Sequence, residues 1–176
     1  MKQKISKINI LIKKKYKYEL LENGFSSKDI SVGKKVLNSK RITMAQYTKN
    51  FENTFAKKLG VKYALMVNSG SSANLLAAFA SGNPLRKKHY KAGDEVIVPS
   101  ISWATTYYPL QQYGLKLNFL DVELDTLNMD VSRLEEALTS KTLMVVAVSI
   151  LGNPCALTVL RDFCAMGFQI QTQQVN

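Results

Sequence analysis

The sequence predicts an α/β fold in which a mainly parallel sheet is flanked by helices. Apolar runs of strand length alternate with stretches of helical periodicity, and glycine or proline turns separate them. The clearest strand spans residues 142–149, where an almost pure apolar run is typical of a strand that is buried on both faces. Such alternation favours a doubly wound sheet with right-handed crossovers, whose ligands bind at the carboxyl ends of the strands.

The elements are predicted in chain order. Helices are expected over residues 48–59, 71–80, 102–113 and 132–138. Strands are expected over residues 62–67, 95–99, 116–122 and 142–149, and residues 167–170 begin another one. Gly60 supplies a glycine stop for the first helix, and Pro109 predicts a kink or break in the third. Ser132 and Glu135 have the spacing of a capping box at the start of the fourth.

Positive charge is concentrated at the start of the chain. Residues 1–41 hold 12 of the 24 Lys and Arg and only three acids, so they carry +9 of the net +11. We therefore divide the chain into a basic amino-terminal arm, residues 1–41, and a domain over residues 42–176. Lysine clusters bind nucleic acid or anionic membranes. The favoured interpretation is a solvated, mobile or partner-contacting arm, so nucleic acid is not the expected ligand.

Composition is that of a globular protein, with 46% hydrophobic and 21% charged residues. No run approaches the roughly 18 to 20 apolar residues of a membrane span. Neither a transmembrane segment nor a signal peptide is therefore expected, and the predicted location is the cytoplasm. Cys155 and Cys164 are the only cysteines, and without a second pair they predict reduced thiols rather than a metal site.

Strand direction sorts the polar residues between the two edges of the sheet. The carboxyl, ligand-binding edge is expected to hold the residues that follow strands, namely 68–72, 100–103, Asp121 and 149–153. Lys141 and His89 precede strands and are expected at the opposite edge. His89 is the only histidine, and three basic residues stand directly before it, so we interpret it as a surface residue rather than a catalyst.

A phosphate-binding turn is predicted after the strand over residues 62–67. Gly70, Ser71 and Ser72 place a glycine and two hydroxyls at a helix amino terminus, where unpaired N–H groups and a partial positive charge attract anions. The turn lacks the glycine patterns of nucleoside triphosphatases and dinucleotide-binding folds, so neither ligand is favoured. On spacing alone, a serine cap on a closely packed helix is an equally good interpretation.

Trp103 is the second candidate binding residue. It lies four residues after the strand end at Pro99, where a flat indole can stack on the ring of an aromatic cofactor. A single tryptophan is more often a core anchor, and that interpretation is favoured for Trp103 on its own.

Several ordered motifs together resemble the DegT/DnrJ/StrS family of pyridoxal-phosphate enzymes that modify nucleotide-linked sugars. The resemblance covers roughly residues 35–165. Residues 103–114, Trp-Ala-Thr-Thr-Tyr-Tyr-Pro-Leu-Gln-Gln-Tyr-Gly, and the Leu-Gly-Asn-Pro turn at 151–154 are most similar to the GDP-4-keto-6-deoxymannose 3-dehydratases within that family. The other matching runs are Phe51-Glu52, Phe55-Ala56, residues 62–76 and residues 93–99.

The resemblance implies a cofactor, a fold and a substrate class. Gly70, Ser71 and Ser72 would hold the phosphate of pyridoxal 5'-phosphate or pyridoxamine 5'-phosphate, and Trp103 would stack against the ring. The implied fold is part of the large domain of the aspartate-aminotransferase type, fold type I, used as a homodimer. The implied substrate is a nucleotide-linked 4-keto sugar, and full-length relatives make deoxy or amino sugars for surface polysaccharide.

Two groups that this chemistry needs are not found in the sequence. In the family, an acid for the ring nitrogen follows the strand after residues 142–149, and a base comes later, histidine in the 3-dehydratases and lysine in the aminotransferases. No Asp or Glu follows Asp162, and the glutamine-rich residues 171–176 depart from the family pattern. We therefore expect a truncated homologue, incomplete at its carboxyl terminus, with no catalytic residue of its own and little or no turnover.

Three functions stay open at this point. The favoured one is a 3-dehydratase-like enzyme fragment that, in its full-length form, removes the 3-hydroxyl of a 4-keto-6-deoxy sugar. The second is a fragment of a sugar aminotransferase of the same family. The third, of a different class, is a non-catalytic binding or assembly module that uses the basic arm.

Overall fold

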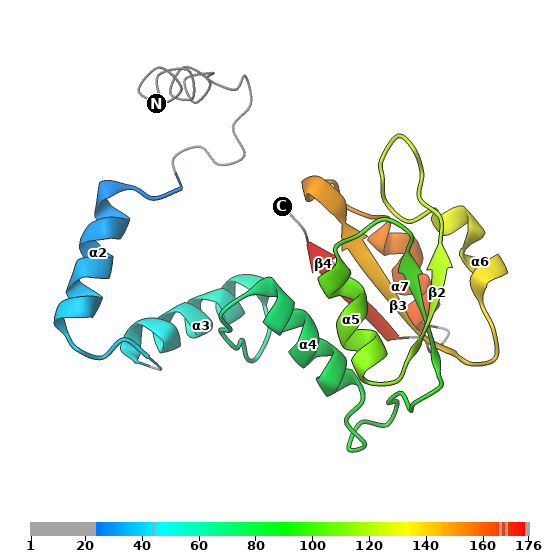
Figure 1. Ribbon diagram of the computed structural model, residues 1–176, viewed down its shortest axis with the longest axis horizontal. Coiled ribbons are helices and arrows are strands. Elements are labelled where there is room, and N and C mark those ends of the chain that lie inside the picture. Colours follow the sequence, from blue (N-terminus) through cyan, green and yellow to red (C-terminus); the bar gives the residue numbers. More distant parts are fainter. Residues whose placement is uncertain (1–23, 44, 166, 168, 175–176) are drawn as a thin grey trace, which may run out of the picture. The chain divides into compact units, whose positions relative to one another are not determined.

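The computed structural model describes residues 24–43, 45–165, 167 and 169–174, and the chain divides into two compact units between Met66 and Val67. In the first unit the described residues form α2 (Ser27–Asn38) and α3 (Gln46–Leu59) (Figure 1). α2 lies inside the predicted basic arm, where no helix was expected. The division of the chain at residue 41 stays a prediction.

The start of α2 has a capping box that the sequence analysis missed. The Ser26 hydroxyl accepts the Asp29 N–H at 3.2 Å, and the Asp29 carboxylate accepts the Ser26 N–H at 2.8 Å. The Ser26 hydroxyl also donates to the Asp29 carboxylate at 2.6 Å, and this bond, together with the one from the Ser26 N–H, lowers the pKa of the Asp29 carboxyl. The Ser-x-x-Asp spacing was therefore a readable signal for this helix.

The strand predicted over residues 62–67 is wrong. These residues have no regular secondary structure, and no strand of the described residues pairs with them. The Met66 N–H instead donates to the Glu52 carboxylate at 2.9 Å, and Tyr63 and Leu65 are exposed. An apolar run of this length becomes a strand only where a neighbouring strand accepts its backbone hydrogen bonds. Before this segment, α3 ends at Gly60 in the left-handed conformation, as predicted.

The second unit holds a parallel sheet with helices, which confirms the predicted fold class. Its elements are α4 (Gly70–Ser81), β1 (Glu95–Pro99), α5 (Ala104–Gln112), β2 (Lys116–Leu120), η1 (Val131–Arg133), α6 (Leu134–Ala137), β3 (Thr142–Ser149), η2 (Ile150–Gly152), α7 (Leu157–Ala165) and β4 (Gln169–Gln174). The strands form one four-stranded sheet in the order β2-β1-β3-β4, and every pair is parallel. β4 is the strand predicted to begin at 167–170, and it continues through the glutamine-rich residues as far as Gln174.

Both faces of the sheet are buried, because residues of β1 and β3 alternate between two apolar clusters. Val96, Val98, Met144, Val146 and Val148 pack in one cluster with residues of α4 and α5. The other cluster takes the intervening strand residues together with the helices that follow β2 and β3, and its members include Ile97, Val145, Ala147, Leu134, Leu160 and Phe163. This two-sided burial explains the almost pure apolar sequence of β3.

The break predicted at Pro109 is not observed, because α5 runs through this residue. Proline has no N–H, so it leaves the carbonyl four residues earlier, that of Thr105, without its helical donor. The Asn74 side-chain amide from α4 donates to this carbonyl at 3.3 Å. The bond therefore replaces the missing helical one and joins α5 to α4, which lie side by side in Figure 1.

The capping role predicted for Ser132 is also wrong. Asp130 is the cap: its carboxylate accepts the Ser132 N–H at 3.1 Å and the Ser132 hydroxyl at 2.6 Å. The predicted helix is accordingly split into η1 and the short α6. Within the described ranges, no helix combines the length and the apolar character needed to cross a bilayer.

Candidate cofactor site

The predicted phosphate-binding turn is the amino terminus of α4. Ser69 is the residue before the helix, and its hydroxyl accepts the Ser72 N–H at 3.1 Å. The Ser72 hydroxyl in turn donates to the Asn68 side chain at 2.6 Å. The N–H groups of Gly70 and Ser71 belong to the first turn, where no preceding helical carbonyl can accept them. They are the donors that this turn offers to an anion.

Ser72 therefore has a different role in the turn from Gly70 and Ser71. Its N–H and its hydroxyl are both engaged in the cap, so Ser72 shapes the turn in this state of the chain. Gly70 is exposed, and a Cβ added to it would meet nothing within 4 Å. Packing inside the chain does not require glycine here, which leaves the space in front of the turn open to a ligand.

Trp103 is exposed rather than buried, so the interpretation as a core anchor is wrong. Its side chain is 66% exposed, and its extended backbone leads directly into α5. Exposing the large apolar surface of an indole to water is unfavourable unless a ligand or a protein covers it. Exposure therefore favours the stacking role over the packing role.

The two predicted binding elements are neighbours through the contact between α4 and α5. The Asn74–Thr105 hydrogen bond ties the second turn of α4 to the first turn of α5. A hollow of about 170 Å³ lies between them, and it is lined by Ser71, Leu75, Thr105, Tyr108, Pro109 and Gln112. The turn that carries Ser71 and the helix that begins after Trp103 are thus held as one structure.

The sorting of polar residues by sheet edge is confirmed where hydrogen bonds test it. The Ser100 hydroxyl donates to the Asp121 carboxylate at 3.2 Å across the carboxyl ends of β1 and β2. At the other edge, the Glu95 N–H donates to the Lys141 carbonyl at 2.9 Å. His89 lies in the loop before β1, where it is half-buried and its Nδ1 is 3.1 Å from the Arg86 carbonyl oxygen.

Asn128 is a structural residue of the carboxyl edge that the sequence analysis missed. It is 6% exposed, and its amide nitrogen donates to the carbonyls of Asn153 and Pro154 at 3.2 and 3.1 Å. Its side-chain oxygen accepts the Ile150 N–H at 3.4 Å. Asn128 therefore holds the turn after β3, in which Leu151 has a φ of 51° that a leucine rarely adopts. No local sequence pattern predicts that an asparagine will bond to backbone groups so far away in the chain.

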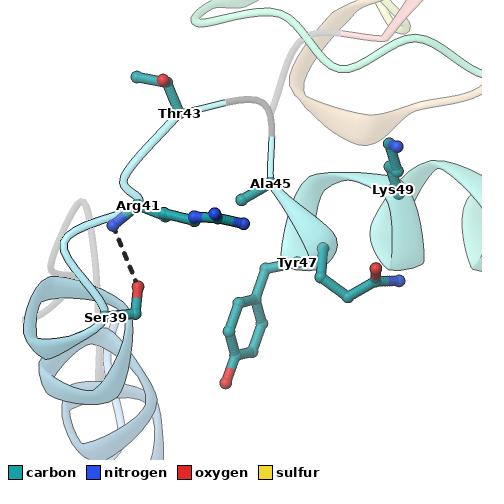
Figure 2. Close-up of a pocket in the computed structure, with 7 residues that line it drawn as sticks. Ser39, Arg41, Thr43, Ala45, Tyr47 and Lys49 are labelled. Carbon is teal, nitrogen blue, oxygen red and sulfur yellow. Dashed lines mark hydrogen bonds between the residues drawn. The ribbon is translucent and has the colours of Figure 1, made fainter.

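A second hollow, of about 420 Å³, lies in the first unit between the end of α2 and the start of α3. Figure 2 shows its lining, which includes Arg41, Tyr47 and Lys49, and the hydrogen bond from the Arg41 N–H to the Ser39 hydroxyl. The lining side chains are mostly exposed. It is an open concavity whose charged groups keep their contact with water, unlike those of a closed binding site.

The residues of the second unit fit a phosphorylated aromatic cofactor in two respects. Two first-turn N–H groups at a helix amino terminus suit a phosphate dianion. The neighbouring exposed indole suits one face of a flat ring. The described residues contain no group of three or more His, Cys, Asp or Glu side chains that could hold a metal ion.

Comparison with known proteins gives the same picture. The profile of the DegT/DnrJ/EryC1/StrS aminotransferase family matches residues 25–167. The chain is 48% identical over 140 residues to the GDP-4-keto-6-deoxy-D-mannose 3-dehydratase of Escherichia coli O55:H7, which covers 78% of this chain and 35% of that protein. It is 35% identical over 109 residues to the GDP-perosamine synthase of Escherichia coli O157:H7, covering 62% of this chain and 28% of that protein.

Solved structures agree with the sequence relatives. The E. coli GDP-4-keto-6-deoxy-D-mannose-3-dehydratase with bound hydrated PLP superposes with a TM-score of 0.80 at 43% identity, covering 90% of this chain and 40% of that one. A mutant GDP-4-keto-6-deoxymannose-3-dehydratase with bound GDP-perosamine gives 0.81 at 43% identity and covers 41% of its chain. This chain thus spans from 28% to 41% of the length of these relatives. The family match begins at residue 25, so it includes α2, which the predicted resemblance left out.

Proposed function

The chain belongs to the DegT/DnrJ/EryC1/StrS aminotransferase family, and from this premise we propose that it forms the cofactor-holding part of a PLP- or PMP-dependent enzyme acting on a nucleotide-linked 4-keto sugar. The observation that carries the proposal is the joined pair of helices α4 and α5. One presents a first turn with unpaired N–H groups, and the other begins directly after an exposed tryptophan.

Each residue of the pair has a separate proposed task. The N–H groups of Gly70 and Ser71 bind the cofactor phosphate, while Ser72 keeps the turn in shape through its bonds to Ser69 and Asn68. Trp103 covers one face of the ring and excludes water from it. When bound, the cofactor supplies the electron sink that labilises bonds next to the reacting carbon.

Removal of the 3-hydroxyl is the reaction we favour, because the greater identity is to a 3-dehydratase, 48% against 35% for the perosamine synthase. Amino transfer to the sugar is the second candidate, supported by that synthase. The family resemblance implies an acid for the ring nitrogen and a base, and neither is among the residues to which we give a role. We therefore propose full turnover for an enzyme of the relatives' length, and for the 176-residue polypeptide by itself cofactor binding with little or no turnover.

The fluorescence of Trp103 gives a direct test, because it is the only tryptophan of the chain. Titration with PLP or PMP is expected to quench the emission saturably, whereas pyridoxal without its phosphate quenches it at much higher concentration. Ser71→Asp places a negative charge in the first turn of α4 and is expected to weaken PLP binding at least about tenfold by repulsion of the phosphate.

Thr158→Asp is the matched control for this titration. Thr158 is an exposed hydroxyl residue at the second position of α7, as Ser71 is at the second position of α4. It is expected to leave PLP binding unchanged. Equal affinities for PLP and pyridoxal, or equal effects of the two aspartate variants, would exclude a phosphate site at α4.

A further inference from the structure

The amino edge of the sheet carries a cluster of positive side chains that the proposed function does not use. It consists of Arg86, Lys87, Lys88, Lys91, Lys116 and Lys141, all exposed, and we call it the amino-edge patch. Its segments are joined by the backbone. Lys116 N–H donates to the Asp94 carbonyl, Gly93 N–H to the Gly114 carbonyl and Glu95 N–H to the Lys141 carbonyl, at 2.8 to 2.9 Å.

Asp94 and Glu95 stand among these cations, and both carboxylates are already engaged by neutral donors. The Asp94 carboxylate accepts the Lys91 backbone N–H at 2.6 Å, and the Glu95 carboxylate accepts the Thr139 hydroxyl at 2.7 Å. The salt bridge found in the described part of the chain, Arg133–Glu136, involves neither acid. Six cations against two acids therefore leave the amino-edge patch with a net positive charge.

An exposed leucine lies in the loop between α4 and β1, which supplies four of these six cations. Leu85 is 93% exposed and directly precedes Arg86 and Lys87. The Asn83 side chain accepts the Leu85 N–H at 3.0 Å, and the Asn83 carbonyl accepts the Arg86 N–H at 3.0 Å, so this part of the loop is a hydrogen-bonded turn. Because the backbone of this turn is already ordered, little further conformational entropy is lost when the leucine contacts another surface.

The base of the same loop is anchored in the core. The Tyr90 ring is buried, and its hydroxyl donates to the Ala78 carbonyl of α4 at 2.7 Å. On the far side, the Lys88 ammonium donates to the Gly167 carbonyl at 2.9 Å. Leu85 and the basic residues beside it thus belong to a loop held at both of these points.

We propose that the amino-edge patch and Leu85 form a contact surface for an anionic lipid bilayer. Lysine and arginine side chains near an anionic leaflet are attracted to its headgroups. A protruding aliphatic side chain among them gains by entering the boundary between headgroups and acyl chains. Single-stranded nucleic acid is the poorer fit, because its bases are typically held by stacking aromatic side chains, whereas the exposed side chain here is aliphatic.

This surface leaves the cofactor site accessible. The start of α4 lies at the carboxyl edge, because Asn74 donates to the Thr105 carbonyl in the first turn of α5, which follows the carboxyl end of β1. The amino-edge patch lies at the opposite end of these parallel strands. In Figure 1 the arrows of β1 and β2 point away from the loop that joins α4 to β1. A bilayer at one edge therefore does not cover Gly70 or Trp103 at the other.

Vesicle co-sedimentation of the full 176-residue chain tests the proposal. Vesicles of phosphatidylcholine mixed with phosphatidylglycerol are expected to bind it, and vesicles of phosphatidylcholine alone or high salt are expected to weaken binding strongly. Arg86→Glu/Lys87→Glu is expected to lower the partition coefficient at least about tenfold. The control Lys57→Glu/Lys58→Glu makes the same charge change at an exposed pair on α3.

The aliphatic contribution has its own matched pair. Leu85→Ser is expected to lower vesicle binding several-fold, whereas Leu124→Ser, at a 90% exposed leucine between Glu123 and Asp125, is expected to have no effect. The proposal is overturned if the two double variants lose binding equally, because basic residues elsewhere then account for it. It is also overturned if a single-stranded oligonucleotide displaces the chain from the vesicles and Leu85→Ser binds as the parent does.

Discussion

The two edges of the parallel sheet differ in charge, and the candidate phosphate site lies at the acidic edge rather than at the basic one. The carboxyl-edge segments, residues 68–72, 100–103, 121–130 and 149–154, contain four acids and no Lys or Arg. The amino edge carries the six cations of the amino-edge patch. The candidate phosphate site nevertheless lies at the carboxyl edge, where it relies on backbone N–H groups and the dipole of α4. Phosphate recognition there is short-ranged and directional, whereas attraction to the amino edge is long-ranged and diffuse.

The edges also differ in what holds their loops. At the carboxyl edge, Asn128 and Asn153 fix the turn after β3 through side-chain bonds to backbone groups. At the amino edge, the loop before β1 is fixed by the packed ring of Tyr90. Damage to one edge should therefore spare the ligand of the other, and the predictions below test this separation.

The largest effect is expected at the carboxyl edge from Asn128→Ala. The substitution leaves up to three backbone groups without their partner, and each unsatisfied buried group costs about 1–3 kcal/mol. Urea unfolding should therefore show a loss of at least about 2 kcal/mol. PLP affinity should fall as the turn after β3 relaxes, while vesicle binding should stay at the parental level.

Asn118→Ala is the control for that experiment. The Asn118 side chain makes a single bond, to the Ala137 carbonyl at 2.7 Å, and lies on β2. It should lower stability by about 0.5–1.5 kcal/mol and leave PLP affinity unchanged. Parallel losses of PLP affinity in the two variants would mean that stability alone, and not the turn after β3, governs the site.

A somewhat smaller effect is expected at the amino edge from Gly82→Ala. A Cβ at Gly82 would lie 2.7 Å from the buried ring of Tyr90, and overpacking of this kind costs roughly 1–3 kcal/mol. Vesicle binding should fall because the loop that carries Leu85 moves, and PLP affinity should be retained. Gly33→Ala in α2 is the control: nothing lies within 4 Å of the added atom, so the helix should gain roughly 0.5–1 kcal/mol. A PLP site that weakens in Gly82→Ala would show that the two edges are not independent.

The sequence pattern was sufficient for elements that have packing partners inside the second unit. β1 and β3 are almost entirely apolar because both faces of the sheet are covered, and α4 is a run of small and apolar residues, so all three lie at or within one residue of their predicted bounds. Residues 62–67 have the same apolar character, but without a neighbouring strand they form no strand. A local pattern describes what a segment can bury, not whether a partner is present.

The parts of the site that escaped prediction depend on contacts between distant residues. The cap at Asp130 rather than Ser132 shifts a boundary by two residues, within the usual uncertainty of helix ends. Asn128 bonds to groups 22 to 26 residues away, and Asn74 replaces a bond that Pro109 removes from Thr105. No spacing rule connects such pairs. The exposure of Trp103 likewise depends on what surrounds it: taken on its own the residue favoured the core, the family resemblance implied stacking, and the structure leaves the indole exposed.

The smallest effect is expected from Tyr90→Phe, and it depends on pH. Burial, and secondarily the charge of Tyr113, raise the pKa of the Tyr90 hydroxyl above its ordinary value of about 10. The folded chain therefore holds this proton more tightly than the unfolded chain does. The stabilisation is complete below about pH 10 and is lost as the pH rises through the raised folded pKa.

Tyr90→Phe removes this dependence together with one hydrogen bond. Near neutral pH it should cost about 1 kcal/mol, because the Ala78 carbonyl still accepts the Gly82 N–H. Above about pH 10 the stability of Tyr90→Phe should fall less steeply than that of the parent, so the difference narrows in urea titrations at increasing pH. Tyr63→Phe, at an exposed tyrosine, controls for the loss of a hydroxyl. A gap between Tyr90→Phe and the parent that widens with pH would contradict a proton held more tightly in the folded state, and the packed ring alone would then account for the anchoring of the amino edge.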